Sequence, residues 1–202
     1  MTMYATVAEI KAALSIGTAD TASDTLIAAA GSAASAMIDN YCGRTFGTAV
    51  ATRYYAADDA CLLYVDDIAG TAITVETAPS LDGSYSVTFG TADYQLEPLN
   101  GISNGVPSPY TVIRAIGNYT FPVSSEAAVK VTATFGRSAV PDTVTYATKL
   151  LAESLFKRLD SPLGVAGFGD MGVIRVSRYM DPTVELLLSP YRTGGNAVGG
   201  VA

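Results

Sequence analysis

The sequence contains no histidine and no tryptophan, and only two of its 202 residues are cysteines. Without histidine, Ser-His-Asp and Cys-His nucleophile pairs cannot form, and the commonest side-chain ligand of transition metals is missing. Cys42 and Cys61 have no metal-binding spacing, and two thiols in a chain of this length do not make a disulfide framework. We therefore expect two reduced thiols, with Cys42 packed at a helix end, and neither a cofactor nor a bound metal.

Charged residues are also scarce, at 15% of the chain. The 12 basic and 19 acidic residues give a formal charge of −7, which argues against a nucleic-acid clamp or an anionic membrane surface as a partner. So little charge is unusual for the surface of an isolated protein, and we expect copies or partners to cover part of it. No run of about 18 apolar residues is present, and the first residues do not resemble a secretory signal. We expect the folded chain to act in solution, away from membranes.

The N-terminal segment predicts two helices. Residues 6–9, Thr-Val-Ala-Glu, form a capping box that opens a short helix ending near Leu14. A longer helix begins at Asp20 or Ser23 and ends at Gly43. Its small residues between positions 28 and 35 predict close packing against another helix, with a ligand groove as the alternative. Its apolar stripe at helical spacing consists of Leu26, Ile27, Ala30, Ala34, Met37, Ile38 and Tyr41.

A third helix, predicted from about Pro141 to Leu159, is the segment around which the chain is organised. Pro141 and Asp142 suit its first turn, and Ser161-Pro162 ends it. Its long apolar stripe needs partners, and the other long helix lies in the N-terminal segment, so we expect the two ends of the chain to fold together. The stripe consists of Val144, Ala147, Leu150, Leu151, Ser154, Leu155 and Leu159.

From position 52 the apolar period changes from about 3.6 to 2, which predicts an antiparallel β module. Turn signals lie at residues 81–84 and at Asp66-Asp67, and residues 100–109 read as a long loop that no strand could run through. The predicted strands are residues 53–56, 61–65, 72–76, 85–89, 94–97, 111–116 and 129–135.

After the third helix we expect a mobile loop over residues 164–172, a short strand over 173–177 and a last helix that Asp181-Pro182 caps and Ser189-Pro190 stops. We thus predict an α+β fold: a small helical bundle, formed by the N- and C-terminal segments, with an inserted antiparallel β module. The expected parts are an N-terminal helical part (1–50), the β module (51–137), a C-terminal helical part (138–192) and a flexible tail (193–202).

Several motifs suggest chemistry, but each has a more ordinary interpretation. Residues 167–172 match G-x-G-x-x-G, yet a helix precedes them and a strand follows, the reverse of a dinucleotide site, so a hinge or docking loop is favoured. Ser154 and Lys157 match S-x-x-K, but Ser154 lies in mid-helix, where it favours packing.

Acidic pairs and tyrosines are the remaining candidates. Asp58-Asp59 and Asp66-Asp67 lack the spacing of a calcium loop, so solvated turns are favoured over an ion site. Two positioned acids would suffice for glycan cleavage, but nothing singles out two of the 19. Six tyrosines predict sheet packing or a protein interface rather than an aromatic binding face: Tyr54, Tyr55, Tyr85, Tyr94, Tyr110 and Tyr119.

Three stretches together carry a resemblance to a known family. They are Ala-Ser-Ala-Met-Ile-Asp-Asn-Tyr-Cys-Gly-Arg-Thr-Phe at 34–46, Asp-Tyr-Gln-Leu-Glu-Pro at 93–98, and the segment from Val-Pro-Asp at 140–142 to Leu-Phe-Lys-Arg-Leu-Asp-Ser-Pro-Leu-Gly-Val-Ala-Gly-Phe-Gly at 155–169. With these, the chain resembles tailed-phage head-to-tail connectors, specifically the head-tail adaptor family of phages of actinobacteria. It departs from shorter members in its large β insertion.

The resemblance implies a structural virion protein of the neck, without catalysis, assembled in the host cytoplasm. Its subunits would form a ring, commonly dodecameric, beneath the portal protein, with head-completion or tail proteins docking below. Because the chain is acidic, we expect genomic DNA to pass without specific binding through an acidic or neutral lumen. By position, the candidate interface residues toward the portal or a neighbouring subunit are Gly164, Val165, Gly167, Phe168, Gly169, Arg175, Arg178, Asp181, Tyr191 and Arg192.

Two other functions compete with the ring adaptor. The first is a carbohydrate-binding or glycan-cleaving β protein with helical decoration, and the second is a small regulatory binding module. The association of the purified chain with itself and with a portal separates the adaptor from both.

Overall fold

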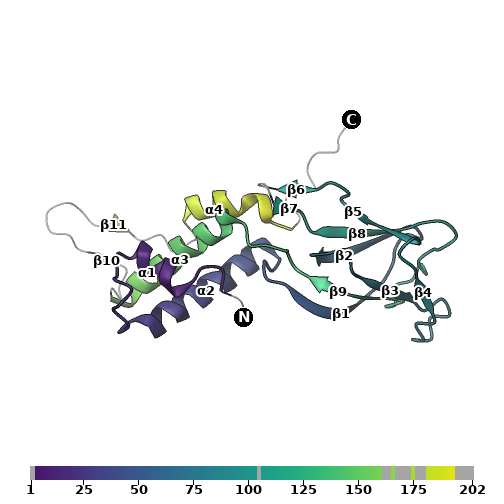
Figure 1. Cartoon of the computed structure of the whole chain (residues 1–202), viewed down its shortest axis with the longest axis horizontal. Coiled ribbons are helices and arrows are strands. Elements are labelled where there is room, and N and C mark those ends of the chain that lie inside the picture. Colours follow the sequence, from purple (N-terminus) through teal and green to yellow (C-terminus); the bar gives the residue numbers. More distant parts are fainter. Residues whose placement is uncertain (1–2, 104–105, 161–164, 167–173, 176–180, 194–202) are drawn as a thin grey trace. The chain divides into compact units, whose positions relative to one another are not determined.

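The computed structural model describes residues 3–103, 106–160, 165–166, 174–175 and 181–193. The chain divides into two compact units, and each is described by itself. The helical unit combines Met1–Arg44 with Val140–Ala202, and the β unit is Thr45–Ala139. Among the described residues, four α-helices lie in the first unit and a seven-stranded antiparallel sheet lies in the second (Figure 1), so the predicted α+β class is confirmed.

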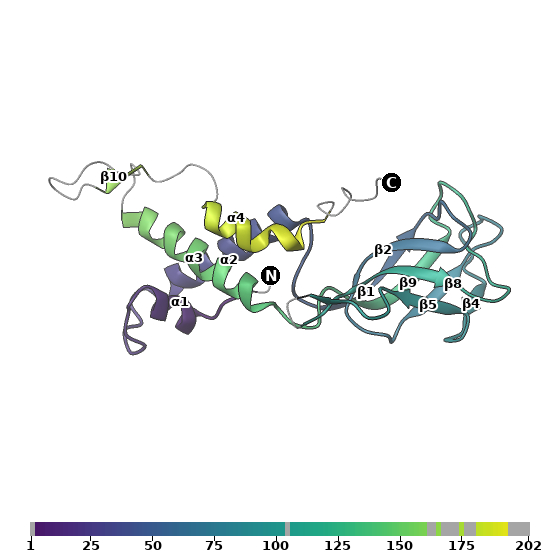
Figure 2. The same ribbon diagram turned by 90° about the horizontal axis from the view of Figure 1, so that it is seen from above.

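The helical unit is built on α3 (Asp142–Asp160), which packs against α1 (Val7–Ala13), α2 (Asp24–Cys42) and α4 (Pro182–Leu188). Figures 1 and 2 both show α4 lying along α3. The predicted third helix is therefore confirmed to within one residue at each end. Its predicted stripe is partly right: Val144, Ala147 and Leu151 are buried, but so are Thr148 and Ala152, which the stripe did not include.

The start of α1 and the end of α2 have the predicted causes, but the start of α2 does not. In the capping box of α1, the Glu9 backbone N–H donates to Thr6 Oγ1 (3.2 Å) and the Thr6 backbone N–H donates to Glu9 Oε2 (2.7 Å). α2 starts after Ser23, whose side chain makes no capping hydrogen bond. It ends at Gly43, which adopts a left-handed conformation with φ of 65° that suits glycine.

Small residues on α2 let other segments pack closely, as predicted. A Cβ atom on Gly31 would lie 2.6 Å from Met3 Sδ and 2.8 Å from Ile10 Cδ1, so the missing side chain makes room for the N-terminal segment and α1. The predicted stripe is only partly right. Ile27, Ala30, Ala34 and Ile38 are buried, but Leu26 and Met37 are 51% and 38% exposed, because the neighbouring elements cover one side of α2 only.

The last described helix begins as predicted, because the Asp181 carboxylate accepts a hydrogen bond from the Thr183 N–H (2.7 Å) and Pro182 fills the first helical position. Its end at Leu188, immediately before Ser189-Pro190, is also as predicted. Ser189–Tyr191 then follows as a separate turn of 3₁₀ helix, which tolerates proline near its start. Two further short strands, β10 (Val165–Ala166) and β11 (Ile174–Arg175), pair antiparallel, and the rest of the predicted glycine-rich loop lies outside the described residues.

All seven predicted strands are present in the sheet, and the bounds of β5 and β9 agree with the prediction. The strands are β1 (Ala49–Tyr55), β2 (Leu62–Ile68), β3 (Thr74–Thr77), β4 (Val87–Phe89), β5 (Tyr94–Glu97), β8 (Tyr110–Ala115) and β9 (Val129–Phe135). Strands β3 and β4 form a hairpin across the predicted turn at residues 81–84.

Two predicted breaks are wrong. Asp66-Asp67 does not end a strand but lies inside β2, where a shift of register relative to β8 absorbs the irregularity. The segment 100–109 contains a two-residue ladder of β6 (Ile102–Ser103) with β7 (Val106–Pro107). Proline is tolerated there because it sits at the end of a short strand that needs few donors.

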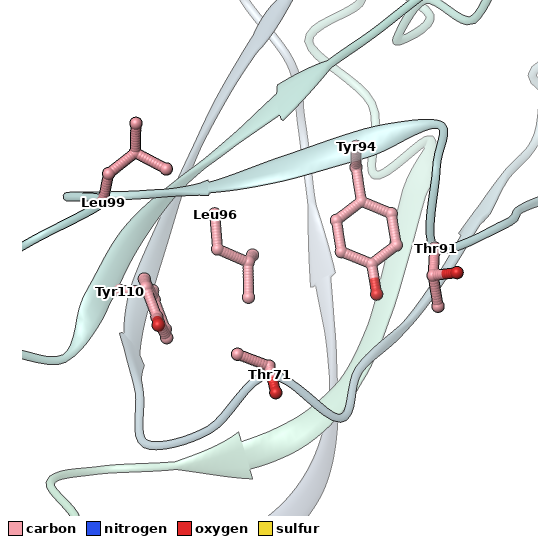
Figure 3. Close-up of a pocket in the computed structure, with 6 residues that line it drawn as sticks. All are labelled: Thr71, Thr91, Tyr94, Leu96, Leu99 and Tyr110. Carbon is pink, nitrogen blue, oxygen red and sulfur yellow. The ribbon is translucent and has the colours of Figure 1, made fainter.

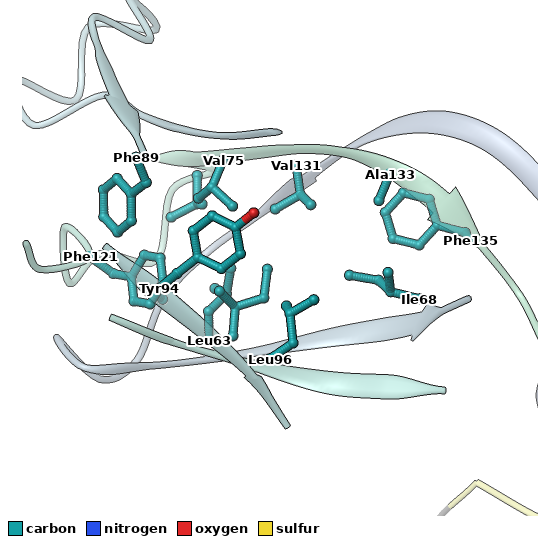
Figure 4. Packing of buried hydrophobic residues seen from close by; sticks show 13 residues of the cluster. Leu63, Ile68, Val75, Phe89, Tyr94, Leu96, Phe121, Val131, Ala133 and Phe135 are labelled. Carbon is teal, nitrogen blue, oxygen red and sulfur yellow. The ribbon is translucent and has the colours of Figure 1, made fainter. Parts of the chain in front are cut away.

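The strand pairings form two layers with β9 at the corner. One edge of β9 pairs with β1, and its other edge pairs first with β3 and then, at Phe135, with Ile68 of β2. This gives the layers β1-β9-β3-β4 and β2-β8-β5, and the core side chains of both point into the space between them (Figure 4). The core includes Leu63, Ile68, Val75, Phe89, Leu96, Ile113, Phe121, Val131 and Phe135. Among the described helices, none combines the length and apolarity needed to cross a bilayer.

Candidate functional site

Each acidic pair that was a candidate ion site has a carboxylate engaged within the β unit. Asp59 Oδ1 accepts hydrogen bonds from the backbone N–H groups of Cys61 (2.6 Å) and Leu62 (3.0 Å), which caps the start of β2. Asp66 forms an ion pair with Arg53 (2.6 Å). Over the described ranges, no group of three or more Cys, Asp or Glu side chains is arranged to hold a metal ion.

The other sequence motifs do not assemble a reactive centre in the described residues. Ser154 is half-buried within α3, and Lys157 is paired with Glu153 one turn earlier on the same helix. The glycine motif at 167–172 lies outside the described residues. Burial raises the pKa of the Cys42 thiol to about 11, which keeps it protonated and unreactive at neutral pH, while Cys61 is exposed; both thiols are free, as predicted.

Four of the six tyrosines are packed in the β unit, as predicted, whereas Tyr54 and Tyr119 are 58% and 36% exposed. Tyr94 is 9% exposed, and Tyr55, Tyr85 and Tyr110 are half-buried. The hydroxyl of Tyr85 donates to the backbone oxygen of Ala127 (2.6 Å), and that of Tyr55 donates to Asp66 (2.9 Å). Burial, with the neighbouring Asp66 carboxylate, raises the pKa of Tyr55 to about 12.

The predicted interface residues near the C-terminus have different environments. Val165 pairs with Arg175 in the β10-β11 ladder, and Asp181 caps α4. Tyr191 is buried, with its hydroxyl 2.9 Å from Thr143 Oγ1, so it contributes to packing inside the helical unit. The Arg192 guanidinium is exposed and lies over the Tyr41 ring, 5.1 Å from its centroid. Gly164, Gly167, Phe168, Gly169 and Arg178 lie outside the described residues.

The sequence placed Thr193 in the expected flexible tail and gave no sign of its contact with α2. Its backbone N–H donates to the backbone oxygen of Cys42 (2.8 Å), and its hydroxyl donates to the same oxygen. This contact holds the last described residue against the C-terminal end of α2. No local signal predicts it, because the partners are 151 residues apart.

The β unit has an acidic surface on which its cations are neutralised. Arg53 pairs with Asp66, Arg114 with Glu97 (2.6 Å) and Lys130 with Glu76 (2.6 Å), while Arg137 is buried. The hydrogen bond from Arg114 lowers the pKa of Glu97, and the hydrogen bond to Glu76 raises the pKa of Lys130, so Glu97 and Lys130 are ionised near neutral pH. Since the unit carries 9 acidic and only 4 basic residues, it offers little attraction to phosphate groups.

An open groove of about 400 Å³ lies beside β5 (Figure 3). Tyr94 and Leu96 of β5 point toward Thr71 across it, and no charged side chain lines it. A groove of this kind can accept an apolar side chain, but it holds no acid or base for catalysis. The six lining residues are Thr71, Thr91, Tyr94, Leu96, Leu99 and Tyr110.

The clearest candidate for a functional surface is the outer face of α2, defined here by Leu26, Ala29, Ala33 and Met37. These residues are exposed and recur at helical spacing on a face of α2 that flanks its buried stripe. The sequence between Asp24 and Asp39 contains no charged residue. The outer face of α2 therefore carries two alanines and two larger apolar side chains and no charge. Such a face permits close contact with another protein surface.

Comparisons with known proteins find similarity in structure. No family model matches the chain. No curated protein matches its sequence. Among solved structures, a chain from the neck of an empty GTA particle, computed with C6 symmetry, has a TM-score of 0.58 at 19% sequence identity over 93% of this chain and 88% of that one. A chain from the neck of a native GTA particle, computed with C12 symmetry, has a TM-score of 0.52 at 18% identity over 93% and 87% of the two chains. At these identities the matches establish a common fold.

Proposed function

We propose that this chain is a structural virion protein, a head-to-tail adaptor of the family found in phages of actinobacteria. It forms a homo-oligomeric ring beneath the portal, joins the DNA-filled capsid to the tail and lets DNA pass. The observation that carries the proposal is the fold shared with neck chains of GTA particles, because the likeness extends over 93% of the chain and thus includes both units. Its place is the neck of the virion, after assembly in the host cytoplasm.

The outer face of α2 supports the ring. Neighbouring copies in a ring must bury apolar surface that a free subunit exposes, and an exposed helix face without charge can be buried at low desolvation cost. Leu26, at 51% exposure, and Met37, at 38%, supply apolar area at the two ends of this face. The alanines between them let a second helix approach closely. We take twelve copies as the expected number, as the family resemblance implies.

The remaining partners follow from the resemblance and the charge pattern. We propose that residues 165–178 and the segment from Asp181 onward meet the portal or a neighbouring subunit, and that head-completion or tail proteins dock on the opposite side of the ring. The paired cations of the β unit support passage of DNA without specific binding, because they leave few phosphate contacts. The protein then has a mechanical role and needs no catalytic residue.

The test combines coexpression with the cognate portal and one substitution on the outer face of α2. Wild-type protein should give a ring-shaped complex on portal in negative-stain electron microscopy and a matching mass in light scattering. Ala33→Glu should abolish the complex, because it places a charge in the proposed contact. Its free energy of unfolding should change by no more than about 0.5 kcal/mol, because Ala33 is exposed.

Ala8→Glu is the matched control, since Ala8 is an exposed alanine on α1 and away from the outer face of α2. This variant should assemble like wild type. Two results would count against the proposal: a wild-type chain that ignores the portal, or an Ala33→Glu variant that assembles normally.

A further inference from the structure

Strand β1 is an edge strand, and the register shows which of its backbone groups are free. At the end of β9, the Gly136 N–H donates to the Asp67 oxygen (2.7 Å) and the Ala69 N–H donates to the Thr134 oxygen (2.8 Å), so even-numbered residues of β9 face the edge shared by β2 and β3. Backbone groups of successive residues in an antiparallel strand face opposite edges. The odd-numbered residues of β9 therefore bond to β1.

The register pairs these odd-numbered residues with positions 49, 51, 53 and 55 of β1. The N–H and C=O groups of Val50, Thr52 and Tyr54 consequently point away from β9. In the part of the chain that the structure describes, no hydrogen bond reaches them. The side chain of Val50 is 78% exposed and that of Tyr54 is 58% exposed, so this edge is open over most of its length.

The other edges of the β unit are shorter or capped. By the same alternation, β4 presents only Thr88 and β5 only Tyr94 and Leu96, after which Pro98 ends the pairing. The outer edge of β2 is closed by side chains, because the Leu62 N–H donates to Asp59 and the Asp66 N–H donates to the Tyr55 hydroxyl. β1 has no proline or lysine to protect it, although such residues commonly block unwanted pairing at edges.

The sequence of β1 is complementary to itself in one antiparallel register. When Thr52 lies opposite Thr52 of a second copy, Val50 lies opposite Tyr54, and all three free positions fall in hydrogen-bonded pairs. Aromatic and β-branched residues form favourable cross-strand pairs. The single charge of β1, on Arg53, lies opposite Ala51 and is already neutralised by Asp66.

We propose that the free edge of β1 binds β1 of a second copy of this chain, antiparallel and centred on Thr52. The second copy is the occupant that the observations favour, because among its described strands only β1 has a free edge of matching length. The paired strands exchange six backbone hydrogen bonds. This contact is two-fold symmetric, so it closes after two copies and cannot propagate around a ring. It is a contact of the free protein, distinct from ring formation.

The test is the mass of the full-length chain in sedimentation velocity over a concentration series. The wild type should show a monomer-dimer equilibrium. Thr52→Lys should abolish the dimer, because two ammonium groups would face each other across the two-fold axis. Thr88→Lys is the matched control: it makes the same change at an exposed threonine on β4 and should leave the dimer intact.

A cross-link tests the register. With the exposed Cys61 replaced by serine, Thr52→Cys should form a covalent dimer on mild oxidation, because Cα atoms of a hydrogen-bonded pair lie about 5.5 Å apart, within disulfide range. Thr88→Cys in the same background should remain monomeric under denaturing conditions. A wild type that stays monomeric, a dimer that Thr52→Lys leaves intact, or a Thr52→Cys variant that does not cross-link would each overturn the proposal.

The experiments distinguish a failure of the proposed β1 dimer from a failure of the proposed neck role. Thr52→Lys should still join a portal complex, since ring contacts are assigned to α2, whereas Ala33→Glu should still form the dimer. If the chain dimerises but does not bind the portal, the β1 dimer is supported and the neck role is contradicted.

Discussion

In the helical unit, the outer face of α2 extends from Leu26 to Met37 without a charged side chain, whereas in the β unit Arg53, Arg114 and Lys130 each lie beside a carboxylate. The helical unit leaves this helix face uncharged by composition. The β unit instead neutralises its basic groups by pairing them with carboxylates, while its surface stays acidic. The first is visible in the sequence, while the second depends on the register of the sheet.

The cores differ as well. The helical unit packs mainly alanine, glycine and aliphatic residues around α3, with Tyr4 and Tyr191 as its buried aromatic residues, while the β unit places aromatic rings between two layers, with Phe89 stacked on Phe121 at 5.4 Å between centroids. Close helix approach needs small residues, and the wider space between sheet layers needs large ones. Three predictions test how separate the two units are, from the largest expected effect to the smallest.

Truncation of a core residue should destabilise mainly its own unit. We expect Phe135→Ala to cost about 3–5 kcal/mol in the β unit and Ile38→Ala about 2–5 kcal/mol in the helical unit, because both side chains are buried and each change leaves a cavity. Hydrogen exchange of the full chain should show faster amide exchange in the substituted unit. Equal acceleration in both units would mean that they unfold as one.

Gly136→Ala should be the next largest change and should affect the β unit. Gly136 has φ of 110°, and a Cβ atom there would lie 1.9 Å from the backbone oxygen of Gly47, so the backbone must move. We expect a loss of about 3 kcal/mol, seen as a lower thermal midpoint. Gly70→Ala is the control, because a Cβ atom at Gly70 meets no atom within 4 Å. Similar midpoints for the two variants would contradict this account.

Thr6→Ala should have the smallest effect, at about 1 kcal/mol, since it removes the capping box of α1. Hydrogen bonds from Thr6 lower the pKa of Glu9 below 4.5, so their stabilising effect is complete above that value and is lost as the pH falls through the folded-state pKa. The difference in unfolding free energy between wild type and Thr6→Ala should therefore shrink on acidification below about pH 4.5. Chemical denaturation at several pH values measures it, with the exposed Thr25→Ala as control. A difference that is constant with pH would exclude the contribution of Glu9.

The accuracy of the sequence predictions depended on whether the determining interactions were local. The capping box at Thr6, the αL glycine at Gly43 and the Asp181-Pro182 cap are local signals, and each marks a helix terminus in the structure. Alternation of apolar and polar residues located β5 and β9 correctly. The early part of β1 was missed because Ala49 and Ala51 carry little strand propensity, and only pairing with β9 makes that segment a strand.

The candidate functional surface was only partly predictable. The low charge of α2 was evident, but Leu26 and Met37 were assigned to its buried face, since a wide apolar stripe does not reveal which side the other helices cover. Thr193 and the free edge of β1 depend on partners that are distant in sequence. Likewise, Asp66 could be recognised as acidic, but its pairing with Arg53 required the three-dimensional structure.

The side chain of Lys11 has a practical consequence. It is only 3% exposed, and its ammonium group donates to the backbone oxygens of Thr18 and Asp20 and to the Asp24 carboxylate. An acylating reagent should therefore react with Lys11 only when the connection between α1 and α2 opens, whereas Lys157, at 66% exposure, should react at once. The ratio of acylated Lys11 to acylated Lys157 would then measure how often the connection between α1 and α2 opens during assembly.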